Sequence, residues 1–494
     1  MTSKILSGYK LIINYLGMFA VLVGIILMVP LTLILFRPEE FQQAHYFFVP
    51  GAISILIGTL VLFMFRKYEK GKLERQQDAI LVVSIWIMSI IISAMPFYMT
   101  GLFSFTESIF EVTSGYSTTG LTVVNVETIP SIFLLYRSLL QFFGGVGFVL
   151  VLTSAVSDRL NMRLYNAEGH SDKLVPNLIR SGRIILSIYV GYILIGTIFL
   201  MIFGMPGFDA LNHATCAVAT GGFSTKAASI GFYDNVAIEI TIMILMLLGG
   251  TNFFVHLMLI KGKLKNVISH VEIKLLGLYL LVFIPLFAIS FLNFYQGDLV
   301  HSMRYGSFQM ISAITGTGYQ TIPTFINIPP FVFGGLILLM VLGAGLGSTA
   351  GGMKQYRVAL AGKSLIWSVK EQLAHKKTIR THFINRLGTK SIVEKEDINQ
   401  NHAFLMVYIV VLLIGTLIFT FYGHSFENSL FEFASALGTV GLSVGIAGAG
   451  APNGILWTST LGMFLGRLEF YVIFVAIAKI VVDLSKKRYL RKES

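Results

Sequence analysis

Four short polar segments interrupt an otherwise apolar chain, and they align without a gap when one glycine in each is placed in the same column. The aligned glycines are Gly120, Gly222, Gly318 and Gly441. In each segment an apolar or aromatic residue follows the glycine, and a hydroxyl or amide side chain follows that. The segments read STTGLT at 117–122, ATGGFS at 219–224, TGTGYQ at 315–320 and GTVGLS at 438–443. Such self-similarity indicates one structural unit that is used four times.

The agreement between the four segments continues upstream of the glycine. The sixth position before it holds a small hydroxyl or thiol residue: Ser114, Cys216, Ser312 and Ser435. The ninth position before it is always polar: Glu111, His213, Gln309 and Glu432. Columns that run in parallel over this distance predict a short helix before each glycine.

Apolar runs of membrane-spanning length flank each segment, and two more precede the first. The runs at 11–36 and 49–65 can each cross a hydrocarbon core of about 30 Å, which takes roughly 20 helical residues. With 55% hydrophobic and 13% charged residues, the mean hydropathy is +0.76. The sequence therefore predicts an integral membrane protein rather than a soluble one.

The basic residues predict how the chain is oriented. If the N-terminus is cytoplasmic, ten full spans place 32 of the 37 Lys and Arg residues inside, which agrees with the positive-inside rule and puts both termini in the cytoplasm. Binding of nucleic acid by these runs is disfavoured, because they lie between spans instead of forming one patch. The basic stretch at 354–395 is long enough to dock a cytoplasmic partner.

The predicted fold is an all-α integral membrane protein with two N-terminal transmembrane helices and four pseudo-symmetric repeats around a central pore. Each repeat consists of a span, a pore helix, a filter loop and a second span. The expected units are 1–75 for the N-terminal helices, then 76–160, 161–265, 266–400 and 401–494 for the repeats and the cytoplasmic tail. The short helices must be re-entrant, because a loop at membrane depth is tolerated only where it lines a cavity.

The glycine loops predict a cation-selectivity filter. A crossing cation exchanges its hydration shell for protein oxygens, and glycine permits a backbone whose carbonyls point the same way. The partial negative charge at the end of each short helix favours a cation there. The predicted filter residues are Thr118, Thr119, Gly120, Thr220, Gly221, Gly222, Gly316, Thr317, Gly318, Thr439, Val440 and Gly441. The alternative is that these glycines serve close helix packing.

Three other features bear on the predicted pore. The run 343–352 breaks the second span of the third repeat, and it can form an irregular segment beneath the filter or a glycine-rich helix contact; its residues of interest are Gly343, Gly345, Gly347, Ser348, Thr349, Gly351 and Gly352. Arg467 lies within a span, so it should face the pore or a partner such as Glu469. The acidic residues near the starts of the short helices are expected to cap them or to concentrate cations at the mouth; they are Glu107, Glu111, Asp209, Glu427 and Glu432.

The four glycine segments together resemble those of the Trk/Ktr/HKT potassium-transporter superfamily, and the two leading spans and the length look like its bacterial TrkH branch. The resemblance implies potassium as the permeant ion, without an organic cofactor, and one filter glycine in each repeat. It also implies that 343–352 is an intramembrane gating loop and that Arg467 restricts permeation. A homodimer in the inner membrane and a TrkA-like nucleotide-binding ring in the cytoplasm are implied as well.

These features predict potassium uptake through one gated filter and argue against three other classes. A voltage-gated channel would carry a span with Arg or Lys at every third position, and an inverted-repeat transporter would carry midspan carboxylates. A membrane enzyme would need a metal cluster or a nucleophile beside a base, so the chain is not expected to be an enzyme. A proton- or sodium-coupled potassium symporter and a less selective potassium and sodium channel remain open, because both use one filter.

Overall fold

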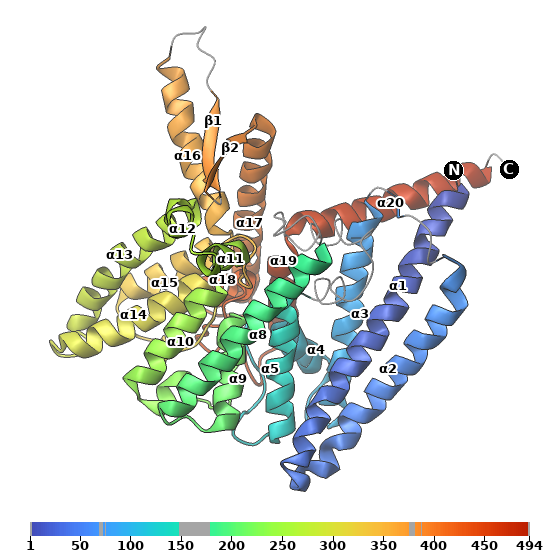
Figure 1. Ribbon diagram of the computed structural model, residues 1–494, viewed down its shortest axis with the longest axis horizontal. Helices are drawn as coiled ribbons and strands as arrows, with labels where there is room; N and C mark the ends of the chain where they lie inside the picture. The colour runs from blue at the N-terminus through green and yellow to red at the C-terminus, as the bar shows by residue number, and fades with distance from the viewer. Residues whose placement is uncertain are drawn as a thin grey trace.

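The computed structural model describes residues 2–68, 73–74, 76–147, 178–374, 381–386 and 388–492 of the chain. Within these residues helices predominate, and they are gathered into one body from which one helical element and a hairpin project (Figure 1). The packed apolar side chains form two large clusters. One joins the N-terminal helices to the first glycine segment, and the other surrounds the remaining three segments.

The first two long helices form an antiparallel pair at one edge of the body (Figure 1). They are α1 (Thr2–Met28) and α2 (Ala44–Phe65), joined through the 3-10 turns Val29–Leu35 and Pro38–Gln43. Glycines let their backbones approach closely, since a Cβ atom on Gly24 would lie 2.7 Å from the carbonyl oxygen of Gly51, and one on Gly58 would lie 2.6 Å from that of Gly17. Small residues serve this purpose in membrane helices, where burial in lipid gives no packing force of its own.

After this pair, one order of elements recurs four times along the chain. A long helix is followed by a short helix, an irregular glycine loop and a second helix that is also shorter than the first. The four sets are α3 (Gln77–Met99), α4 (Phe105–Tyr116) and α5 (Ser131–Val146); α8 (Leu178–Ile202), α9 (Gly207–Val218) and α10 (Val236–Gly249); α13 (Val271–Leu292), α14 (Leu299–Thr315) and α15 (Pro330–Leu342); and α17 (Lys395–Phe421), α18 (Phe426–Gly438) and α19 (Asn453–Leu468).

The second helix of each set is shorter than the sequence predicted. In the described part of the chain six helices are long and apolar enough to cross a membrane, or up to seven if a bent pair counts as one span, whereas the sequence predicted ten. At 1.5 Å per residue, helices of 13 to 16 residues reach only about 20–24 Å, less than a hydrocarbon core of about 30 Å. In three of the four, the shortfall arises because the helix stops at a break within the described residues.

Three of the second helices end in a break within the described residues, although the sequence singled out only the third. The chain bends by 106° between α10 and α11 (Phe253–Ile260). An irregular stretch separates α15 from α16 (Gln355–Gln372), and α19 gives way to α20 (Phe470–Lys492) at Glu469, whose φ is 57°. Glycine-rich sequence marks the break after α15, and two glycines, Gly249 and Gly250, stand at the break after α10.

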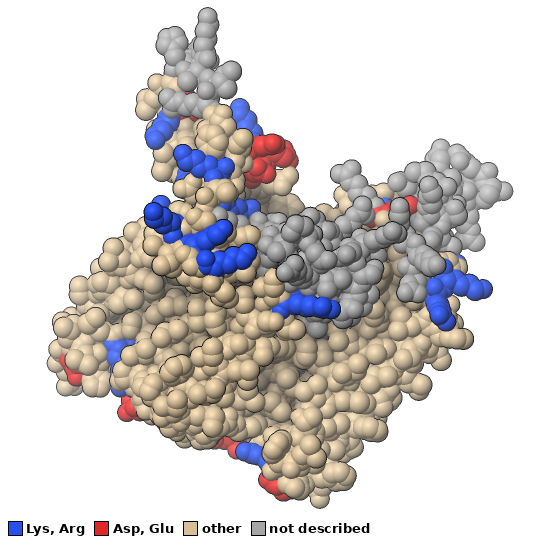
Figure 2. Space-filling model, viewed as in Figure 1, with Lys and Arg blue, Asp and Glu red and all other residues tan. Residues whose placement is uncertain are grey.

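The basic stretch after α16 contains a feature that an all-α prediction missed. Strands β1 (His382–Arg386) and β2 (Thr389–Val393) form an antiparallel hairpin in which His382 pairs with Val393. The hairpin packs on α16 and projects with it from the end of the molecule where both termini lie (Figure 1). On the face shown in Figure 2, most Lys and Arg side chains gather at this same end. The short helix α12 (Leu264–Ser269) lies at its base.

Candidate functional site

The four glycine loops share one backbone path. In each loop, the residue two positions before the glycine and the glycine itself both have positive φ: Thr118 (56°) and Gly120 (97°), Thr220 (51°) and Gly222 (72°), Gly316 (70°) and Gly318 (85°), and Thr439 (51°) and Gly441 (97°). Threonine is β-branched, so a positive φ is a strained conformation for it, and such strain is typical of functional sites. The sequence columns therefore correspond to a common conformation.

One backbone hydrogen bond recurs behind each loop. The amide of the residue before the glycine donates to the carbonyl oxygen six positions before the glycine, at the end of the short helix. The four bonds are Thr119 to Ser114 (2.9 Å), Gly221 to Cys216 (2.8 Å), Thr317 to Ser312 (3.0 Å) and Val440 to Ser435 (2.9 Å). Each short helix thus fixes the start of its own loop.

The four glycines bring the loops against one another in a closed cycle. A Cβ atom on any of these glycines would overlap the carbonyl oxygen of the residue that precedes the glycine of the next loop. The contacts are Gly120 with Gly221, Gly222 with Thr317, Gly318 with Val440, and Gly441 with Thr119. The order runs from the first loop through the second, third and fourth and back to the first, so the four backbones enclose a common centre.

Helix packing follows the same cycle. The second helix of each set packs on the short helix of the next: α5 on α9, α10 on α14, α15 on α18, and α19 on α4. Elements that are more than 300 residues apart in sequence therefore meet, which no local pattern could have predicted. The loops, the short helices and the second helices close in one common order.

The residue six positions before the glycine supports the loop in two different ways. The hydroxyl oxygens of Ser114 and Ser435 accept hydrogen bonds from the amides of Gly120 (3.1 Å) and Gly441 (2.9 Å). Ser312 instead donates to the carbonyl oxygen of Tyr319, at 2.6 Å. Where the column holds a cysteine, Gln141 of α5 braces the second loop, donating to the carbonyl of Gly221 and accepting from the amide of Phe223. Sequence analysis missed Gln141 because it lies outside the aligned columns.

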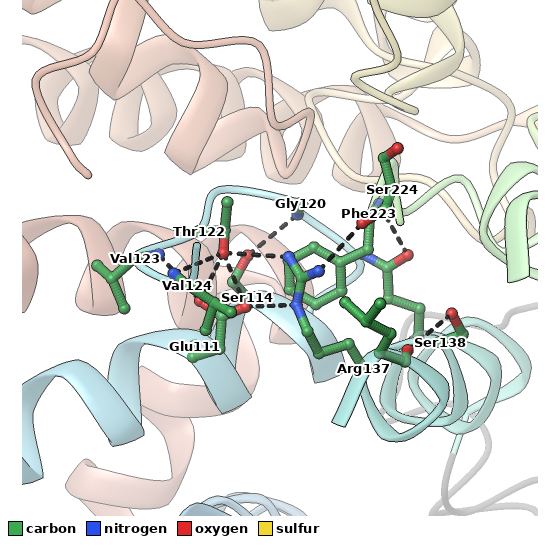
Figure 3. Close-up of polar contacts among 12 residues, drawn as sticks. Glu111, Ser114, Gly120, Thr122, Val123, Val124, Arg137, Ser138, Phe223 and Ser224 are labelled. Atoms are coloured by element: carbon green, nitrogen blue, oxygen red, sulfur yellow. Dashed lines mark hydrogen bonds and ion pairs between the residues drawn. The ribbon is translucent and has the colours of Figure 1, made fainter. Parts of the chain in front are cut away.

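The polar residue nine positions before the glycine lies in mid-helix and braces the chain just after the loop. Glu432 accepts hydrogen bonds from the hydroxyl of Ser443 (2.7 Å) and the amides of Val444 (2.8 Å) and Ala447 (2.9 Å). Glu111 does the same for Thr122 and also binds Arg137 (Figure 3). The prediction that Glu111 and Glu432 cap their helices is therefore wrong, because both are buried a turn or more from the helix start. The same prediction is confirmed for Glu107, which forms a capping box with Ser104 at the start of α4.

A cavity of about 480 Å³ opens on one side of the loops. All four glycines, Gly120, Gly222, Gly318 and Gly441, line it, together with residues that follow them in sequence. The irregular stretch 343–354 lies on the opposite side, where the short helices end. Because one cavity reaches all four loops, the loops stand between an open space on one side and this stretch on the other.

The tip of the stretch 343–354 contacts the same position in all four loops. Thr349 shares a hydrogen bond with the hydroxyl of Thr220 (2.8 Å), and its carbonyl oxygen accepts one from Thr118 (3.3 Å). A Cβ atom on Gly351 would overlap the Thr439 hydroxyl, and one on Gly316 would lie 3.4 Å from the Ala350 side chain. The tip therefore covers the shared centre of the loops.

The base of the same stretch is held by the helix breaks around it. The amide of Gly345 donates to the carbonyl of Gly250 (3.0 Å), and that of Leu346 donates to the carboxylate of Glu272 at the start of α13 (2.8 Å). Sequence analysis did not identify Glu272. Nearby glycines serve the short helices instead: Cβ atoms on Gly144, Gly249 and Gly466 would overlap carbonyls at the ends of α4, α9 and α18.

Arg467 joins two parts of this region. Its guanidinium donates to the carbonyl of Thr349 in the tip and to those of Gly144 and Gly145 near the end of α5. The carboxylate of Glu469 accepts hydrogen bonds from Arg357 of α16, the shorter at 2.6 Å. Arg467 thus lies beside the tip on the side away from the cavity.

These features define a class of protein: a multi-pass membrane protein for transport, with strained backbone loops around one centre, an opening on one side and a cover on the other. The chain belongs to the TrkH family of cation transport proteins, whose family model matches residues 43–487. The family likeness inferred from the four glycine segments is thereby confirmed. Members of this family transport ions and are not enzymes.

Relatives cover nearly the whole chain. An uncharacterized cation transporter of Methanocaldococcus jannaschii is 28% identical over 97% of this chain and 96% of its own length. The Trk system potassium uptake protein TrkH of Escherichia coli K12 is 28% identical over 94% of this chain and 98% of its own. The crystal structure of the potassium transporter TrkH from Vibrio parahaemolyticus has the same fold, with a TM-score of 0.83 at 23% identity, covering 94% of this chain and 98% of that one.

Proposed function

We propose that this protein takes up potassium across the cytoplasmic membrane through one selectivity filter built from the four glycine loops. The observation that carries the proposal is the closed cycle of backbone contacts from Gly120 through Gly222, Gly318 and Gly441. Four backbones that enclose one centre can present rings of four carbonyl oxygens, which replace the hydration shell of an ion. The potassium uptake named for the relatives supports potassium as that ion.

The predicted filter residues then have distinct roles. The glycines and the residues before them supply the carbonyls, and the left-handed residues Thr118, Thr220, Gly316 and Thr439 turn the chain at the start of each loop. The short helices end at the loops, so their C-terminal partial charges favour a cation at the centre. The chain then forms four pseudo-symmetric repeats around a central pore, with the two N-terminal helices of 1–75 beside them. The repeats are 76–160, 161–265, 266–400 and 401–494.

The stretch 343–352 is proposed to be the gate of this pore. Its tip contacts all four loops where a permeating ion would leave them, and its base is anchored to the break after α10 at Gly250 and to the start of α13 at Glu272. Gly343, Gly347 and Gly352 have positive φ, so the glycine content permits this path. Ser348 closes a turn on the carbonyl of Gly345. Movement of the base would withdraw the tip, because the two are only a few residues apart.

Orientation and partners follow from the basic end of the molecule. We place both termini and the projecting α16 and hairpin in the cytoplasm, since Lys and Arg gather there (Figure 2). A surface for a TrkA-like regulatory ring is offered by the exposed apolar residues Leu365 and Val369 of α16, Leu373 directly after it and Ile392 of β2. The homodimer rests on the family resemblance.

The proposed function can be tested on purified protein in liposomes. Reversal potentials measured under potassium, sodium and proton gradients are expected to follow the potassium gradient. Displacement of the reversal potential by a proton or sodium gradient at fixed potassium would favour a coupled symporter instead. Equal responses to potassium and sodium would show a less selective channel and contradict the proposal.

Replacing Arg467 with alanine is expected to raise potassium flux by about threefold or more, because a charge in a low-dielectric path is a barrier to a cation and its contact with the tip is lost. Flux into liposomes measures this. Arg467→Lys keeps the charge and should stay near the wild-type flux. Unchanged flux from Arg467→Ala, together with a lower unfolding temperature, would assign the residue to folding alone.

A further inference from the structure

Arg137 of α5 is a charged residue buried beside two of the glycine loops. It and its partner Glu111 of α4 are each only 1% exposed, and its Nε atom lies 2.7 Å from the carboxylate. Burying an ion pair costs desolvation energy that the mutual attraction often only balances. Because apolar side chains of similar volume often fill such a space as stably, stability alone does not account for the pair.

The guanidinium reaches both of the neighbouring loops (Figure 3). One terminal nitrogen donates to the hydroxyl of Thr122 (3.0 Å), and the other donates to the carbonyl of Ser224 (3.2 Å). Its carbon atom lies 3.9 Å from the centre of the Phe223 ring, within cation–π range. Thr122 and Ser224 each stand two residues after the glycine of their loops, so Arg137 joins the first and second loops at the same level.

The carboxylate of Glu111 completes the link on the side of the first loop. It accepts hydrogen bonds from the hydroxyl of Thr122 (2.9 Å) and the amide of Val123 (3.0 Å). One turn along α5 from Arg137, Gln141 holds the second loop. The guanidinium is a planar fork, so the bonds it makes fix an angle and a distance between the parts they join.

The second helices α10 and α19 can be aligned with α5, and neither carries a charge at the position of Arg137. Gly144, Gly249 and Gly466 take the same place against the short helix of their own set, four residues before the loop glycine. Seven residues before them stand Arg137, Ile242 and Ser459, all buried. The first and second loops are therefore joined by charge-assisted bonds, whereas the equivalent positions of α10 and α19 hold neutral side chains.

We propose that Arg137 is a positioning residue that sets the spacing of the first and second filter loops and thereby the preference for potassium over sodium. The inference rests on the proposed function of the loops as a filter. A carbonyl ring discriminates between the two ions through the spacing and field of its oxygens. Loss of the link would let the distance between the two loops change. Because Glu111 and Arg137 form an ion pair, they add no net charge to the mouth, and the effect on selectivity comes from position.

The test compares permeability ratios of variants in liposomes at matched protein content. Arg137→Gln is expected to lower the potassium-to-sodium permeability ratio by about tenfold or more, because several bonds to a charged group are lost. Arg137→Lys keeps the charge but not the fork, so it should not restore the ratio. The matched control is Arg304→Gln. Arg304 lies on α14, away from the loops, and like Arg137 it binds a carboxylate, donating to Glu239 through two nitrogens (2.8 and 2.7 Å).

A milder variant keeps the proposal testable if Arg137→Gln does not fold. Thr122→Val removes only the hydroxyl that binds both Arg137 and Glu111, and it is expected to lower the ratio by about threefold. An unchanged ratio in a folded Arg137→Gln protein, or in Thr122→Val if the former does not fold, overturns the inference while the filter stands. Full restoration by Arg137→Lys also overturns it, because charge alone would then suffice. A wild-type protein without potassium preference overturns both the filter and the inference.

Discussion

Replacing Gly318 with serine is expected to abolish the preference for potassium over sodium, bringing the permeability ratio to within about threefold of one. Gly318 has a φ of 85°, and a Cβ atom there would overlap the carbonyl oxygen of Val440. The third loop must therefore shift, and the carbonyl of Val440 must turn away from its place in the ring. Reversal potentials with potassium on one side of the membrane and sodium on the other measure the effect.

Gly334→Ser is the matched control for Gly318→Ser. Gly334 lies in α15, the helix that follows the same loop, and no atom lies within 4 Å of a Cβ atom built on it. Its variant should keep the wild-type ratio. Gly120→Ser should behave like Gly318→Ser, because its Cβ atom would overlap the carbonyl of Gly221. Wild-type selectivity in normally expressed Gly318→Ser protein would rule out the filter role of the loops.

Shortening the stretch 343–352 is expected to raise potassium flux by about tenfold or more in the absence of any regulator, because the tip would no longer cover the loops. The stretch can be shortened without separating its ends. The amide of Met353 donates to the carbonyl of Val341 (3.0 Å), and that of Gln355 donates to the carbonyl of Ala344 (2.8 Å). Replacing residues 346–351 with two glycines therefore bridges ends that already lie together.

The control for the shortened loop is Thr349→Ser, which keeps the hydroxyl that binds Thr220. Its flux should match the wild-type flux. Flux is measured as potassium-driven uptake into liposomes at equal protein content, and the permeability ratio is recorded in parallel. A shortened protein with wild-type flux would show that the tip is a packing element rather than a gate. An altered ratio would instead show that the tip supports the filter.

The two expected effects separate selectivity from gating. Gly318→Ser changes which ion passes, since its side chain acts within the loops themselves. Shortening 343–352 changes how much passes, since the tip touches only the start of each loop. Arg137 belongs with the first group, because it binds residues on the cavity side of the glycines. Arg467 belongs with the second, on the opposite side.

The sequence determined the parts of this protein and their order. Apolar runs require membrane helices, and the columns through Ser114 and Gly120 identified four equivalent loops, because a position with positive φ and a carbonyl of the next loop against it admits only glycine. The same columns sufficed to identify the family. They could not show what the ninth position before the glycine does, since Glu111 and Glu432 act on residues that fold back over them.

Only the tertiary structure decided how the parts close on one another. The cycle joins Gly441 to Thr119, more than 300 residues away, and the tip at Thr349 contacts loops from other sets. Arg137 and Gln141 lie outside every sequence column, yet they hold two loops together. A sequence pattern reflects the local conformation and environment of its own segment. Contacts between distant segments depend on where packing brings their backbones, which is why the four loops and the stretch 343–352 could be located in the sequence but the contacts between them could not.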